Sequence, residues 1–153
     1  MKIKAEIAKA NVVNINRRLY TKEALINAVN NYNSKDSLCY LYARPSYKEA
    51  PDWDRGVDRK MEDIIGVCED LKFDNNNNTI VAEFRLIDSN KGKEYQELIR
   101  SGLRQRIVAN YITEGYKGSE EGYSVVRDCK IIHFDLTPES SWANYLDDFS
   151  MID

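Results

Sequence analysis

The sequence predicts an α+β fold in which 153 residues form a single mixed domain, residues 1–153, dominated by β-strands. Three observations lead to this expectation. Strand-like alternation and short apolar runs recur along the chain, whereas three other stretches place apolar residues at helical spacing. Neither an internal repeat nor a Pro- or Gly-rich linker divides the chain. The expected order of elements is β-β-α-β-β-β-α-β-β-α.

The first elements are a strand and a helix. Apolar residues alternate with charged ones from position 2 to position 7, which is typical of a half-buried strand. After a turn at Asn14–Asn16, Thr21 is a suitable helix N-cap, and Glu23 suits the first turn because an acid there favours the helix dipole. The helix would bury one apolar stripe, formed by Leu25, Ala28, Val29 and Tyr32.

The middle of the chain predicts a short strand, a loop and a hairpin. Residues 38–42 form a short apolar run, and residues 46–60 form a long polar loop. Residues 62–73 and 79–87 are predicted to pair as two strands. The Asp/Asn-rich segment 74–78 between them is typical of a hairpin turn, and it lacks the ligand pattern of an EF-hand calcium loop.

The last third predicts a helix, two strands and a helical tail. Ser89 suits the N-cap of a helix that would place Tyr95, Leu98 and Ile99 on one side, and Gly102 suits its C-terminal end. The next strands are expected at 106–113 and 123–136. A C-terminal helical tail is expected over about residues 139–153, because its apolar residues have helical spacing; these are Trp142, Tyr145, Leu146 and Phe149.

The composition argues against several classes of function. The formal net charge of −3 gives no concentrated basic surface, so we expect no direct nucleic-acid binding. No apolar stretch approaches the roughly 20 residues of a membrane span. The three cysteines are widely separated and the acids are scattered, so no set of side chains has the spacing of metal ligands. The glycines do not form a phosphate-binding loop. We therefore expect no metal and no cofactor. The N-terminus does not resemble a signal peptide, so we expect a protein made in a cytoplasm.

Three segments carry a resemblance to a known family: 14–20, 84–103 and 128–138. In order and spacing they resemble the prohead maturation proteases of tailed phages, whose fold is shared with the herpesvirus capsid proteases. The resemblance extends over roughly residues 10–145. It implies a mostly antiparallel, β-barrel-like domain with flanking helices.

The resemblance also assigns two catalytic positions, and neither holds the residue that a serine protease needs. The family has a histidine before a proline, but Arg44 stands there and stays protonated, so it cannot accept a proton. Val108 or Ala109 occupies the nucleophile position, and Asn110 stands where the family has arginine. No Ser, Thr or Cys lies between positions 103 and 112. The resemblance therefore implies a catalytically degenerate member, a pseudoenzyme.

His133 is the only histidine, and the resemblance places it in a strand away from the base position. A lone histidine in a strand is usually a packed structural residue. A rescued active site would require His133 to meet one of four hydroxyl side chains, which are Ser101, Thr113, Ser119 and Ser124.

Aromatic residues supply the candidate interface, because they bring large contact area at low entropic cost. The residues around the former cleft are Tyr40, Tyr42, Tyr47, Trp53, Tyr111 and Tyr116. They could form a docking groove or fill the vacated cleft as core, and the sequence favours neither. The tail stripe of Trp142, Tyr145 and Phe149 is expected to pack on its own domain, and docking on a neighbouring subunit is the alternative.

The resulting functional expectation is a phage virion structural protein. It would be an auxiliary or decoration protein of the capsid that binds the major capsid protein and other head proteins. It would be made in the host bacterial cytoplasm. A homo-oligomer is compatible with this role. Two alternatives remain open: a maturation serine protease with displaced catalytic residues, and a pseudoprotease that regulates head assembly.

Overall fold

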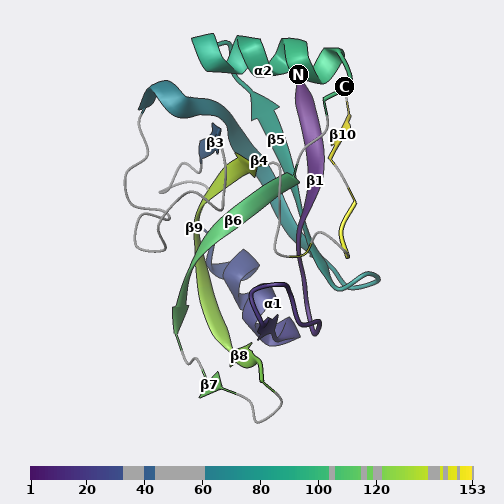
Figure 1. The fold of residues 1–153 in the computed structure, drawn as a ribbon, viewed down its shortest axis with the longest axis vertical. Helices are drawn as coiled ribbons and strands as arrows, with labels where there is room; N and C mark the ends of the chain where they lie inside the picture. The colour runs from purple at the N-terminus through teal and green to yellow at the C-terminus, as the bar shows by residue number, and fades with distance from the viewer. Residues whose placement is uncertain are drawn as a thin grey trace.

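The computed structural model describes residues 1–32, 40–43, 61–103, 106–114, 117–118, 122–137, 142, 145–147 and 149–152. Over these residues the chain forms a seven-stranded sheet with the order β10-β1-β5-β4-β3-β9-β6, a three-stranded sheet with the order β2-β8-β7, and two α-helices (Figure 1). Neighbouring strands are antiparallel except for the β3–β9 and β2–β8 pairs, which are parallel. The predicted α+β class with mostly antiparallel pairing is confirmed.

The elements begin and end as follows: β1 Lys2–Lys9, β2 Arg18–Tyr20, α1 Lys22–Asn31, β3 Tyr40–Ala43, a 3₁₀ turn η2 Met61–Asp63, β4 Ile64–Asp74, β5 Thr79–Leu86, α2 Asn90–Arg100, β6 Arg106–Glu114, β7 Lys117–Gly118, β8 Ser124–Val126, β9 Asp128–Thr137 and β10 Ser150–Met151.

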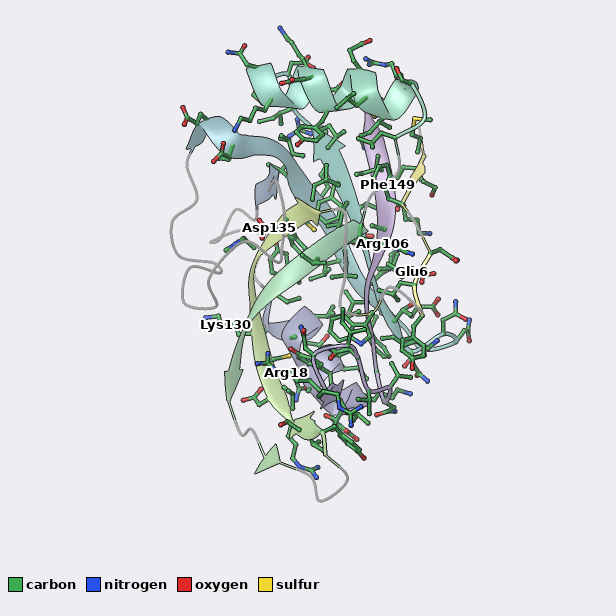
Figure 2. The ribbon with its side chains drawn as sticks, in the orientation of Figure 1. Glu6, Arg18, Arg106, Lys130, Asp135 and Phe149 are labelled. Carbon is green, nitrogen blue, oxygen red and sulfur yellow. The ribbon has the colours of Figure 1, made fainter. Side chains whose placement is uncertain are left out.

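The large sheet is open, so the expectation of a barrel-like domain is corrected. Its edge strands among the described residues are β10 and β6. The sheet nevertheless curls, and Cα atoms of β1 and β6 come within 8 Å of each other. The C-terminal segment lies between these strands: Arg106 of β6 donates to the Leu146 carbonyl, and the Asp147 amide donates to Glu6 Oε2 of β1 at 3.4 Å (Figure 2). This segment takes the place of the direct β1–β6 pairing that would close a barrel.

Irregularities in strand pairing help to curl the sheet. Ile7 is an extra residue between the pairs Glu6–Val81 and Ala8–Ile80. A bulge of this kind bends the strand and lets two successive side chains turn to the same side. Ile7 and Ala8 are accordingly both fully buried, which regular alternation does not allow. The alternation predicted for positions 2–7 is therefore confirmed, and it ends at the bulge, where Ala8 is buried as well.

Helix α1 forms as the sequence predicts. The Thr21 hydroxyl accepts a hydrogen bond from the Ala24 amide at 3.1 Å, which is the N-cap interaction. Ala24, Leu25 and Ala28 are buried, and α1 packs against β9. The helix thereby covers one face of the β9 half of the sheet.

Helix α2 lies across one end of the sheet (Figure 1) and differs from prediction on its buried side. Ser89 Oγ caps it by accepting from the Gly92 amide at 3.0 Å, and Gly102 follows its C-terminus with a φ of 105°, as expected. Leu98, however, is 46% exposed, and Gln96 is buried instead. Gln96 faces the chain just before the helix, where carbonyl and carboxylate oxygens can satisfy its amide.

The core lies between the curled sheet and α1, and the C-terminal segment completes it. Phe84 of β5 and Phe134 of β9 meet edge to face at its centre, with ring centroids 5.0 Å apart. Trp142, Leu146 and Phe149 are buried in the same cluster.

The expected C-terminal helix is wrong for the described part of the tail. Trp142 and Tyr145 belong to a turn in which the Tyr145 amide donates to the Trp142 carbonyl at 2.8 Å, and Ser150–Met151 form β10 against β1. An extended segment spans the space between β1 and β6, which a compact helix would not follow. The helical spacing of the apolar residues is therefore coincidental. Residues 139–141, 143–144, 148 and 153 lie outside the described part.

Candidate functional site

Three adjacent strands carry the positions at which the resemblance implies a protease site. Strand β9 lies between β3 and β6. On β6, Val108 is in register with Asp135, Ala109 with Phe134 and Asn110 with His133. On the other side of β9, the last residue of β3, Ala43, is in register with Leu136. Arg44 follows Ala43 directly in the sequence but lies outside the described residues.

A bulge in β9 decides which side chains share a face. Asn110 pairs with His133, but the next residue of β6, Tyr111, pairs with Ile131, so Ile132 is an extra residue. Cys129 and Ile131, before the bulge, belong to the main core together with Phe134 and Leu136. The bulge therefore turns His133 and Asp135 to the opposite face, where a regular strand would have kept them in line with Ile131.

Val108, His133 and Asp135 form a buried group on this second face. Val108 and His133 are each 8% exposed and Asp135 is fully buried, yet Val108 does not belong to the main hydrophobic core cluster. Ala109 instead packs against that core. Of the two residues assigned to the nucleophile position, Val108 is thus the one that shares a face with the histidine and the acid.

The chemistry of this face is limited by Val108. A serine hydrolase requires a hydroxyl or thiol within hydrogen-bond reach of its base. Val108 has an aliphatic side chain, and the residue in register with His133 is Asn110, an amide. On this face, His133 supplies an imidazole and Asp135 supplies a carboxyl group. Among the described residues, neither of the β6 residues in register with them, Asn110 and Val108, has a nucleophilic side chain.

The hydroxyl side chains considered for a rescued site show no contact with His133 where they are described. Ser101 Oγ donates to the Glu97 carbonyl at 2.9 Å at the end of α2. Ser124 lies in the small sheet, paired with Arg18 of β2. Ser119 and the side chain of Thr113 lie outside the described part of the chain.

Cys129 is the described thiol on β9, but its surroundings oppose nucleophilic chemistry. Its Sγ donates to the Ala24 carbonyl of α1 at 3.7 Å. Burial, aided by the Asp128 charge, raises the pKa of the Cys129 thiol to about 12. Because the thiolate is the reactive form, this side chain stays inert near neutral pH.

The expected interface residues separate into two groups. Tyr40 and Tyr42 lie on β3 and Tyr111 lies on β6, so their backbones flank β9 from both sides. Tyr47, Trp53 and Tyr116 lie outside the described residues.

The tail residues of the expected interface do not form one surface. Trp142 and Phe149 are each 3% exposed, and the Trp142 ring lies 5.1 Å from the Tyr20 ring. Both residues therefore pack on their own chain, whereas Tyr145 is 46% exposed.

Asp135 is the site residue that the patterns in the sequence did not single out. The available signal was a charged residue inside the apolar run 131–136, since a fully buried acid is rare unless it is paired. Within the described ranges, no group of three or more His, Cys, Asp or Glu residues is placed to hold a metal ion. No helix in those ranges is long and apolar enough to cross a membrane.

Comparisons with known proteins support the fold. No family model and no curated protein matches the chain. Among solved structures, the chain is similar to the bacteriophage T4 capsid assembly protease, gp21, with a TM-score of 0.69 and 23% sequence identity. The match covers 89% of this chain and 80% of that chain. The chain therefore has a fold similar to that of a phage prohead protease, as the three sequence segments imply.

Proposed function

We propose that this protein is a non-catalytic structural protein of a phage head, an auxiliary or decoration protein that binds the capsid lattice. The observation that carries this proposal is Val108, an aliphatic residue on the buried face that also holds His133 and Asp135. Because an aliphatic residue at the nucleophile position cannot attack a peptide bond, this protease-like fold would serve binding and not cleavage. The similarity to a capsid assembly protease supports the phage head as the place of use.

The test is quantitative mass spectrometry of purified mature phage particles. A structural subunit should be present at a copy number comparable to that of the capsid protein, with its own termini intact. Absence from the particle, or a few processed copies, would argue for a role confined to assembly.

Catalysis is tested separately with the purified protein and the capsid protein precursor. We expect no cleavage products and no labelling by a fluorophosphonate probe, because such probes require an activated serine. His133→Ala is the matched variant. Cleavage that disappears in His133→Ala would instead favour a maturation protease with displaced residues, an alternative that rests on the burial of His133 and Asp135 on one face.

The third candidate is a pseudoprotease that regulates a separate, active protease. Its signature is genetic and biochemical: a complete protease encoded in the same head-gene cluster, whose cleavage rate changes when this protein is added. A structural subunit would leave that rate unchanged.

A further inference from the structure

The turn at Asn14–Arg18 is a hairpin tip in the half of the molecule where α1 and β8 lie (Figure 1). The Asn14 amide donates to the Arg18 carbonyl at 2.9 Å, and the Arg17 amide donates to the Asn14 carbonyl at 3.0 Å. Val13 and Leu19 form the next pair outward. Residues 15–17 are thus the loop of a tight hairpin.

The turn is fixed from inside by a buried side chain. Asn14 is 4% exposed, and its Oδ1 accepts hydrogen bonds from the Asn16 amide at 3.0 Å and the Arg18 amide at 3.2 Å. From outside, the Ser124 amide of β8 donates to the Arg17 carbonyl at 2.8 Å. The backbone of the tip is therefore held in one conformation before any partner binds.

Arg17 occupies a position that glycine would fill at lower cost. Its φ is 60°, in the left-handed region, where the third residue of a three-residue hairpin loop is ordinarily glycine. Its side chain is exposed, donates through Nε to the Gly122 carbonyl at 3.3 Å, and makes no ion pair within the described part of the protein. A strained residue with a solvent-facing side chain points to a use for that side chain.

Ile15 belongs to the same three-residue loop, 15–17, as Arg17. It is 60% exposed, the highest value among the large exposed apolar residues of the described ranges. An isoleucine and an arginine on a fixed backbone combine an apolar anchor with a charged group, and pre-organisation lowers the entropic cost of binding.

We propose that the Asn14–Arg18 turn docks into a protein surface that offers an apolar pocket for Ile15 and carboxylates for Arg17. This inference rests on the proposed function, and it names the partner as a subunit of the phage shell. A protein is favoured over nucleic acid because phosphates offer Ile15 no apolar pocket and the chain is acidic overall.

The experiment measures binding of the full chain to empty shells assembled from the major capsid protein of the same phage. Arg17→Gly and Ile15→Ser are the test variants. Asn11→Gly is the matched control for Arg17, because Asn11 also has a left-handed φ, 64°, in the same hairpin. Leu98→Ser is the matched control for Ile15, because Leu98 is the exposed leucine of α2.

Each test variant should weaken binding about tenfold or more, whereas both controls should stay within about twofold of the original chain. Arg17→Gly should also unfold at a temperature equal to or above that of the original chain, because glycine relieves the strain. The combination of higher stability and weaker binding is the signature of an arginine kept for a partner.

The contrary outcomes are distinguishable. If the original chain binds shells and the turn variants bind equally well, the docking inference is wrong and the proposed function stands. If Arg17→Gly unfolds at a clearly lower temperature, Arg17 is a structural residue and the inference is wrong. If the original chain does not bind shells, both the proposed function and this inference are wrong.

Discussion

Burial sets the chemistry of Cys129. Its thiol has a pKa of about 12 where an unperturbed thiol would have 9.0, so at pH 8 it is almost entirely protonated. Cys68 is only half-buried. In a Cys39→Ser background, we expect a disulfide reagent at pH 8 to modify the half-buried Cys68 before Cys129, which should react about a thousandfold more slowly than an unperturbed thiol because its thiolate fraction is smaller. Two thiols that react at the same rate would contradict this.

The same thiol predicts a loss of stability in alkali. Between pH 9 and pH 12 the unfolded chain releases the Cys129 proton while the folded chain keeps it. Deprotonation therefore favours the unfolded state, and the free energy of unfolding should fall as the pH rises above about 9. Urea unfolding from pH 8 to pH 11 measures this, with Cys129→Val as the control that lacks the contribution.

Gly92 reverses the usual helix preference. An alanine in the interior of an exposed helix is ordinarily more favourable than glycine by about 1 kcal/mol. A Cβ atom at Gly92, however, would lie 2.0 Å from the Ile87 carbonyl oxygen. We expect Gly92→Ala to destabilise the protein by about 3 kcal/mol, because backbone has to shift. Lys93→Ala, on the exposed side, should change stability by less than about 0.5 kcal/mol in the same urea titration. A Gly92→Ala variant as stable as the original would refute the close packing.

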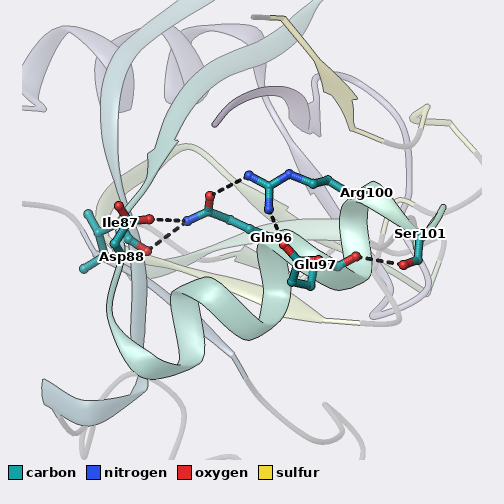
Figure 3. A network of polar contacts seen from close by, with 6 residues as sticks. All are labelled: Ile87, Asp88, Gln96, Glu97, Arg100 and Ser101. Atoms are coloured by element: carbon teal, nitrogen blue, oxygen red, sulfur yellow. Dashed lines mark hydrogen bonds and ion pairs between the residues drawn. The ribbon is translucent and has the colours of Figure 1, made fainter.

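At the scale of elements, α2 is held to the sheet through polar contacts. Gln96 Nε2 donates to the Ile87 carbonyl at 3.2 Å and to Asp88 Oδ1 at 3.1 Å, and Gln96 Oε1 accepts from Arg100 (Figure 3). Ser89 Oγ donates to the Ile64 carbonyl of β4, and Lys91 pairs with Asp63 of η2. The helix is thereby joined to the start of β4 as well as to the end of β5.

Replacing Gln96 tests this attachment. Gln96→Leu keeps the volume but leaves the Ile87 carbonyl without its amide donor, which should cost about 1–3 kcal/mol in the free energy of unfolding. Glu97→Ala removes an exposed ion pair with Arg100 on the same helix and should cost about 0.5 kcal/mol or less. Equal effects from the two changes would show that the buried amide does not hold α2.

The sequence predicts elements well where local signals determine them. Thr21 and Ser89 cap their helices as expected, because a short polar side chain before an amphipathic stretch satisfies the free amides locally. The Asp/Asn-rich turn between β4 and β5 forms for the same kind of reason, with Asp74 Oδ1 accepting from the Asn76 amide. The prediction of a helical tail was wrong because the extended form of the tail depends on contacts with β1 and β6, which are distant from the tail in the sequence.

The sequence predicts the strand that carries Val108 and Ala109, but not the face of the sheet on which each residue lies. Register across β6 and β9 places Val108 and His133 on one face only because Ile132 is an extra residue in β9. No local turn or glycine signal in the sequence marks that bulge, since Ile131 and Ile132 are both residues typical of a regular strand. The sequence therefore assigns Val108 and Ala109 jointly to the nucleophile position. The register of β6 and β9 shows that only Val108 shares a face with His133.

At the scale of the whole molecule, the C-terminal segment binds the two sides of the curled sheet together. Phe149 is 3% exposed within the core, whereas Tyr145, a few residues earlier, is 46% exposed. We expect Phe149→Ala to destabilise the protein by about 3–5 kcal/mol and Tyr145→Ala to change stability by less than about 0.5 kcal/mol, as measured by urea unfolding. A mild effect of Phe149→Ala would mean that the segment is dispensable for the fold.

The pairing of β10 with β1 brings the two chain ends together. The Ile152 amide donates to the Lys2 carbonyl at 3.1 Å, and both ends lie beside α2, far from the Asn14–Arg18 turn (Figure 1). A short peptide could therefore link the ends into a ring, and the chain could be reopened at the exposed Asn75–Asn77 turn without breaking a strand. The same arrangement means that a passenger protein fused to either end would project from the side of the molecule opposite the turn. If that turn faces a shell, such a passenger would be displayed outward.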